Sequence, residues 1–85
     1  LQPSNFPALN NRAVSYRSMG KYDEAISDYT AEIRMNPNYS GAWNGRGSCY
    51  RAKGDVKNAI ADYRKAASLG DKDAAKIAAD LEKEK

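Results

Sequence analysis

The chain contains no histidine and a single cysteine, and these absences exclude several classes of function. Histidine is the commonest general base and the commonest metal ligand in proteins. With Cys49 as the one thiol, the chain can form neither an internal disulfide nor a zinc site of the usual nitrogen and sulfur type. We therefore expect a protein that is not an enzyme and that carries no metal and no cofactor.

Long apolar runs are also missing. No stretch approaches the roughly 18 residues that span a membrane, so we expect no membrane insertion. The first segment, LQPSNFPALNN, lacks the basic region and the apolar run of a signal peptide. We expect a soluble protein and favour the cytoplasm, while a start on Leu1 indicates a processed chain or a piece of a longer one.

What is present fits one small globular domain. The chain has 85 residues, of which 41% are hydrophobic and 29% are charged. A chain of this length buries only about 60–65% of the surface of its unfolded form, so its stability is small. The net charge of +3 contains no run of basic residues, and we do not expect nucleic acid as a partner.

The sequence repeats with a period of 34 residues, and the two copies share ten identical residues without a gap. The identical pairs are Ala8 and Ala42, Asn10 and Asn44, Arg12 and Arg46, Tyr16 and Tyr50, Arg17 and Arg51, Gly20 and Gly54, Ala25 and Ala59, Ile26 and Ile60, Asp28 and Asp62, and Tyr29 and Tyr63. A period of about 20–50 residues is typical of stacked supersecondary units.

The stretch AWNGRGSCYRAKGD, residues 42–55, raises the choice between a phosphate-binding loop and a helix. Neither glycine pattern of a phosphate loop is present, and its partner in the first copy, residues 8–21, has helical spacing. We predict a helix, with Gly47 allowing another helix to approach and Gly54 ending it in a left-handed conformation. Gly45 has no packing reason and is expected to cost about 1 kcal/mol relative to alanine.

The spacing of apolar residues predicts a second helix in each copy, over residues 22–36 and 55–70, and a further helix in the alanine-rich tail. Together with the first helices, these positions resemble the tetratricopeptide repeat, whose pattern is W-x2-L-G-x2-Y, then A-x3-F, then P. The matching residues are Leu9, Arg12, Ala13, Tyr16, Ala25, Tyr29 and Pro37 in the first copy, and Trp43, Arg46, Gly47, Tyr50, Ala59 and Tyr63 in the second. The departures are Arg12 and Arg46 in place of leucine, Glu32 in place of a small residue, and Asp71 in place of proline.

The resemblance implies an all-α solenoid of two antiparallel helix pairs, stacked as a right-handed superhelix, with a capping helix. We expect repeat one over about residues 6–39, repeat two over about 40–73 and the capping helix over about 72–84, in a single domain over 1–85. The resemblance also implies that the first helices line a concave groove for an extended peptide or a partner's helix. Five aromatic residues and Cys49 are expected in the core, namely Tyr16, Tyr29, Trp43, Tyr50 and Tyr63, while Phe6 and Tyr39 at the repeat edges could face either way.

The first helices of both copies carry basic residues and no acid. Asn10 and Arg17 share one helical face with Val14 between them, while Arg12 and Arg46 point roughly the other way. Asparagine amides suit a peptide backbone and arginines suit a carboxylate. The predicted peptide-binding residues are Asn10, Asn11, Val14, Arg17, Asn44, Ser48 and Arg51. The alternative is that the two arginines are solvated or paired with acids of the next helix.

The function predicted from these observations is a non-enzymatic protein-interaction module, a scaffold or adaptor, whose basic groove binds an acidic or carboxylate-ended protein segment. The alternative is a structural two-repeat unit that forms a homo-oligomer or docks within a longer repeat protein. We do not carry over the capture of a peptide's terminal carboxylate seen in some members of the resembled family. Its lysine position holds Pro7 and Gly41, and only Asn11 matches.

Overall fold

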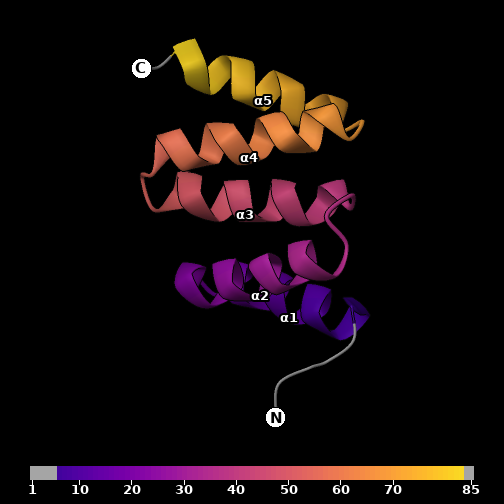
Figure 1. The fold of residues 1–85 in the computed structure, drawn as a ribbon. Helices are drawn as coiled ribbons and strands as arrows, with labels where there is room; N and C mark the ends of the chain where they lie inside the picture. Colours follow the sequence, from indigo (N-terminus) through magenta and orange to yellow (C-terminus); the bar gives the residue numbers. More distant parts are fainter. Residues whose placement is uncertain (1–5, 84–85) are drawn as a thin grey trace.

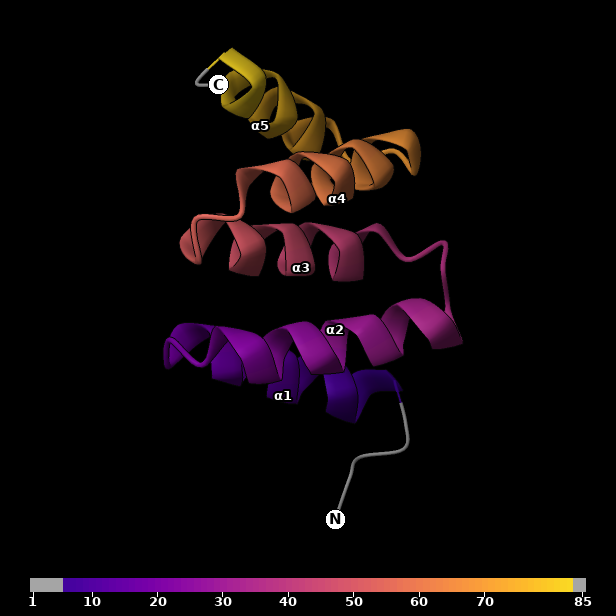
Figure 2. The same cartoon turned by 60° about the vertical axis from the view of Figure 1, so that its left-hand side comes forward.

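The computed structural model describes residues 6–83, and this part of the chain forms five helices and no strand. The helices are α1 (Phe6–Ser18), α2 (Tyr22–Met35), α3 (Ser40–Ala52), α4 (Val56–Ser68) and α5 (Lys72–Lys83). Figure 1 shows that each helix runs antiparallel to the one before it, and Figures 1 and 2 both place α1 and α5 at opposite ends of the stack. The predicted all-α solenoid of two helix pairs and a capping helix is confirmed, and Glu84 of that predicted helix lies outside the described residues.

No helix over residues 6–83 combines the length and the apolar character that a membrane crossing requires.

Within each pair, the two helices are joined by the same closing turn. Gly20 and Gly54 have φ angles of 78° and 86°, as the sequence predicted. The amide of Lys21 donates to the carbonyl of Tyr16 at 2.8 Å, and the amide of Asp55 donates to that of Tyr50 at 2.9 Å. These bonds satisfy carbonyls at the helix ends and fix the direction in which the second helix leaves.

An arginine–aspartate ion pair joins the two helices of each pair. Arg12 Nε and Nη2 donate to the two carboxylate oxygens of Asp28, each at 2.7 Å. Arg46 Nε and Nη2 donate in the same way to Asp62, at 2.8 and 2.9 Å. The two arginines that stand in place of the leucine of the repeat pattern thus each form a two-pronged bond to a buried carboxylate.

The core consists of two clusters that are rich in small side chains. The first contains Ala13, Ala25, Tyr29, Ala42 and Cys49, and the second contains Ala59, Ile60, Tyr63, Ala66, Ala74, Ala78 and Leu81. Burial of Cys49 raises the pKa of its thiol, as for a structural cysteine. Tyr29 and Tyr63 are fully buried, whereas the other expected core aromatics, Tyr16, Trp43 and Tyr50, pack against the clusters half-buried.

Gly45 makes room for the ring of Tyr29. A Cβ atom on Gly45 would lie 2.4 Å from Cζ of that ring, which is closer than real Cβ contacts come. The expectation that Gly45 has no packing reason is therefore wrong, because α2 presses an aromatic ring against this point of α3. Gly47 behaves as predicted, since its Cβ would lie 3.3 Å from Asp62 Cβ on the neighbouring α4.

Glu32 of α2 is fully buried, and neither of its carboxylate oxygens has a hydrogen-bond partner among the described residues. The second copy has Ala66 at this position, where it belongs to the core. Burial, and to a smaller extent the nearby charge of Asp28, raise the pKa of Glu32 to about 7. A carboxylic acid at this position is thus half-ionised near neutral pH, and its ionised form opposes folding.

We expect Gly45→Ala to lower the free energy of unfolding, because the clash with Tyr29, worth about 1–3 kcal/mol, outweighs a gain in helix propensity of about 1 kcal/mol. Urea denaturation of both glycine variants checks this, with Gly47→Ala as the milder control. In a Tyr29→Leu background the same Gly45→Ala change should be neutral or stabilising. A stabilising Gly45→Ala in the wild-type background would contradict the packing described here.

We expect the unfolding free energy to fall as pH rises from about 4.5 to above 7, because Glu32 has a higher pKa folded than unfolded. The loss is at most about 3 kcal/mol, from the size of the shift. Glu32→Ala and Glu32→Gln should both flatten this slope, measured by denaturation from pH 5 to 8. A slope that is identical in wild type and in both variants would show that Glu32 does not cause it.

Candidate functional site

Six of the seven predicted binding residues share one face of α1 or the equivalent face of α3, and we call these positions together the recognition face: Asn10, Val14, Arg17, Asn44, Ser48 and Arg51. α1 contacts α3 directly, so equivalent positions of the two copies lie on neighbouring helices. Val14 and Arg51 are exposed and the other four are half-buried. Asn11 lies off this face. It occupies the position of Gly45, on the side that packs against α2 in the second copy, and is exposed at the end of the stack.

Arg17 lies where α1, α2 and α3 meet. Its guanidinium carbon is 6.0 Å from the centroid of the Tyr29 ring, which in turn packs against Gly45 of α3. The positive charge of Arg17 also reaches Cys49 of α3, where it partly offsets the rise in thiol pKa that burial causes. The side chain therefore belongs to the junction of the two first helices rather than to α1 alone.

Three of the six cations of the first helices and their turns are already paired. Arg12 and Arg46 hold Asp28 and Asp62, and Lys53 forms an ion pair with Asp23. Within residues 6–83, no carboxylate lies within ion-pair distance of Arg17 or Arg51. The arginines that pair with acids of the next helix are thus Arg12 and Arg46, which leaves Arg17 and Arg51 with unpaired positive charge.

Asn44 is partly used by the fold. Its amide nitrogen donates to Asp71 Oδ2 at 2.8 Å, while Asp71 Oδ1 accepts the backbone amide of Ala74 at 3.0 Å. The bond from Asn44, together with the backbone bond, lowers the pKa of Asp71. Asp71 therefore caps α5 and ties it to α3, a role that its place at the expected proline position did not reveal. The carbonyl oxygen of Asn44 remains as an acceptor.

Ser48 is held from beneath by a buried tyrosine. Its Oγ lies 2.8 Å from the hydroxyl oxygen of Tyr63, and either atom can donate. The first copy has Val14 at this position and so lacks this bond. The recognition face is accordingly apolar at Val14 on α1 and polar at Ser48 on α3.

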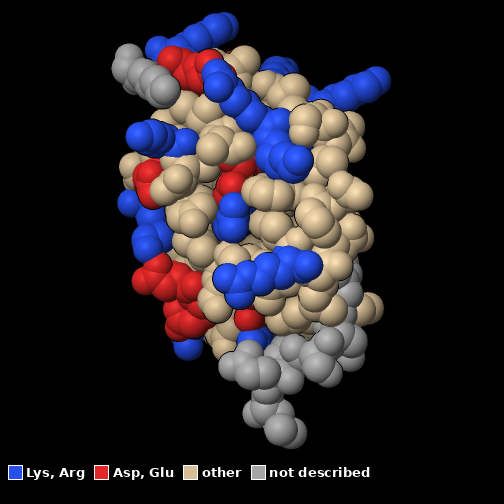
Figure 3. Space-filling view, in the orientation of Figure 1, with Lys and Arg blue, Asp and Glu red and all other residues tan. Residues whose placement is uncertain are grey.

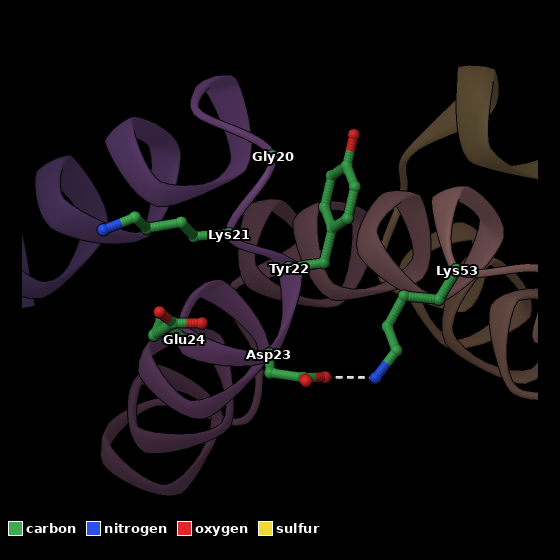
Figure 4. A pocket seen from close by; sticks show the side chains of 6 residues that line it. All are labelled: Gly20, Lys21, Tyr22, Asp23, Glu24 and Lys53. Carbon is green, nitrogen blue, oxygen red and sulfur yellow. Dashed lines mark hydrogen bonds and ion pairs between the residues drawn. The ribbon is translucent and has the colours of Figure 1, made fainter.

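Two hollows lie away from this face. The larger, of about 370 Å³, is lined by Gly20, Lys21, Tyr22, Asp23, Glu24 and Lys53. Figure 4 shows Lys53 reaching from the end of α3 to Asp23, while Lys21 points away from that ion pair. The smaller, of about 170 Å³, surrounds the Arg12–Asp28 pair. Sequence reasoning predicted neither hollow, since each depends on how residues of different elements approach one another.

Charges are unevenly distributed over the surface. On the side of the molecule drawn in Figure 3, acidic side chains gather most densely at the lower left, over the start of α2, and basic ones are scattered elsewhere. The acids of the first turn of α2 are Asp23 and Glu24. Over residues 6–83, no cluster of three or more acidic or cysteine side chains could hold a metal ion.

The comparison with protein families gives a match that spans most of the chain. A family model described as tetratricopeptide repeat matches residues 10–75, which includes most of α1, all of α2, α3 and α4, and the start of α5. None of the curated proteins that were compared with the chain matches it.

Proposed function

Because this chain belongs to the tetratricopeptide repeat family, whose repeats are generally protein-interaction modules, we propose that it binds an acidic segment of a partner protein across the recognition face. The family is typically a scaffold without enzymatic activity, and this role needs no catalytic group. The binding residues are Asn10, Val14 and Arg17 of α1 and Asn44, Ser48 and Arg51 of α3.

The proposal is supported chiefly by which arginines of α1 and α3 form ion pairs within the fold and which do not. Both first helices lack acidic residues, and two of their four arginines are neutralised by Asp28 and Asp62. The other two, Arg17 and Arg51, stand at equivalent positions without a carboxylate partner among the described residues. A guanidinium bonds a carboxylate through two parallel N–H groups, so an acidic side chain or a terminal carboxylate is the ligand that fits it.

The neighbouring polar groups suit an extended backbone. Asn10 offers an amide donor and an acceptor, and Asn44 keeps its carbonyl oxygen beside the bond to Asp71. Val14, whose exposed fraction is 39%, supplies an apolar contact between Asn10 and Arg17. The proposal thus assigns backbone contacts to the amides and side-chain contacts to the arginines.

Self-association is the second candidate, and exposed apolar residues are its support. Besides Val14, the exposed large apolar side chains among the described residues are Met19 and Met35. They flank opposite ends of α2, so they do not form one continuous patch. Singly exposed apolar side chains are normal on protein surfaces, and the acidic-segment proposal has the stronger support.

We expect wild type to bind a fluorescein-labelled glutamate-rich peptide about tenfold more tightly than a lysine-rich peptide of equal length, measured by fluorescence anisotropy. Arg17→Glu/Arg51→Glu should reduce affinity for the acidic peptide about tenfold or more, because attraction becomes repulsion at both positions. Raising the salt concentration should weaken binding to wild type.

The matched control is Arg34→Glu/Lys57→Glu, which makes the same change in net charge at exposed positions of the second helices α2 and α4. Its affinity for the acidic peptide should stay within about twofold of wild type, because a distant exposed charge acts weakly through water. Equal affinity for acidic and basic peptides, unchanged by Arg17→Glu/Arg51→Glu, would overturn the proposal.

A further inference from the structure

The last helix packs in the way that α3 packs, but at an offset of 32 residues instead of 34. Ala42 and Cys49 are the buried residues of α3 in the cluster around Tyr29, and the buried residues 32 positions later are Ala74 and Leu81, in the cluster around Tyr63. The residue before α3 is Tyr39, and the residue before α5 is Asp71, again 32 positions later. α5 therefore takes the place of the first helix of a third pair.

The offset has a simple origin in the chain. α2 has 14 residues and α4 has 13, and the link after α4, residues 69–71, is one residue shorter than the link over 36–39. The two missing residues shift every position of α5 relative to the repeat period. If α5 is aligned with α3 at an offset of 34 residues, its residues are paired with the wrong positions of α3. The sequence pattern alone therefore predicts only that α5 caps the stack.

At the offset of 32, lysines of α5 continue two rows of the recognition face. Lys83 corresponds to Arg51, and hence to Arg17, while Lys76 corresponds to Asn44. Both lysines are exposed, and neither has an ion-pair partner among the described residues. The bond from Asn44 to Asp71, which caps α5, shows that the start of α5 lies beside this face of α3.

We infer that α5 is the third wall of the recognition face, and that the bound acidic segment crosses α1, α3 and α5 so that its carboxylates meet Arg17, Arg51 and Lys83 in turn. This inference rests on the proposed function. Packed helices lie about 8–10 Å apart, and α4 packs against both α3 and α5, so the three cations span at least roughly 20 Å. An extended chain rises about 3.3 Å per residue, and about six or seven residues cover that span.

One acid stands in this surface. Asp80 occupies the position of Ser48 on α5, between Lys76 and Lys83 along the helix, and is exposed. Its negative charge disfavours a ligand carboxylate in the middle of α5, and so directs the acidic segment toward the Lys83 end. Removal of this charge should therefore strengthen binding.

A different role for the three cations must be separated from this one. Arg17, Arg51 and Lys83 each lie in the last turn of a helix, where positive charge suits the helix dipole. That role affects stability and leaves affinity for an acidic peptide unchanged. Lys→Gln substitutions suit the test, because glutamine keeps the helix propensity of lysine while it removes the charge.

The experiment compares two fluorescein-labelled peptides of alternating glutamate and serine, one of about four residues and one of about ten. Wild type should bind the long peptide about tenfold more tightly, because only that peptide reaches all three helices. Lys76→Gln/Lys83→Gln should lower affinity for the long peptide about fivefold and leave the short one within about twofold. Asp80→Asn should raise affinity for the long peptide about twofold.

The control is Lys57→Gln/Lys72→Gln, which removes two exposed charges from α4 and from the first turn of α5 and should bind both peptides as wild type does. Circular dichroism checks that every variant is folded. Wild-type affinity of Lys76→Gln/Lys83→Gln for the long peptide, beside a loss in Arg17→Glu/Arg51→Glu, overturns the inference and leaves the proposed function standing. Wild-type affinity in both variants overturns the proposed function itself.

Discussion

The two-pronged ion pair between an arginine of the first helix and an aspartate of the second is the interaction on which both the packing and the recognition face depend. Asp28 and Asp62 are buried, and a buried carboxylate without a partner is costly, so each needs its arginine. Arg46 also donates to Thr30 at 3.2 Å and so ties α3 to α2 of the preceding pair. Because these bonds neutralise Arg12 and Arg46, the positive charge left on the first helices is confined to Arg17 and Arg51.

Small residues and aromatic rings set how closely the helices approach. More than half of the buried residues in each core cluster are alanines. The absence of a side chain at Gly45 admits the ring of Tyr29, over which Arg17 lies. This close packing makes burial of the Glu32 carboxyl group unfavourable for folding, because the group has no hydrogen-bond partner among the described residues. The second copy has Ala66 at the same position. The stability of the first pair therefore falls as Glu32 ionises with rising pH, whereas the second pair has no ionisable group at this position.

The sequence was sufficient to predict the five helices, because the apolar spacing within each helix and the two turn glycines are local signals. It was not sufficient for contacts between residues far apart in the chain. The reason for Gly45 lies in a ring on another helix, and the partners of Arg12 and Arg46 stand 16 residues away across a turn. The bond from Asn44 to Asp71 and the shifted register of α5 follow from link lengths, which a fixed repeat period hides.

The central claim is that two arginines serve the fold while two remain for a partner, and NMR spectra of the arginine Nε–Hε groups test it most directly. In the free protein, the Hε protons of Arg12 and Arg46 should exchange slowly with water, since each is bonded to a buried carboxylate. On addition of an acidic peptide, the signals of Arg17 and Arg51 should shift while those of Arg12 and Arg46 stay in place. Rapid exchange at Arg12 and Arg46, with peptide-induced shifts confined to those two residues, would contradict this division of roles.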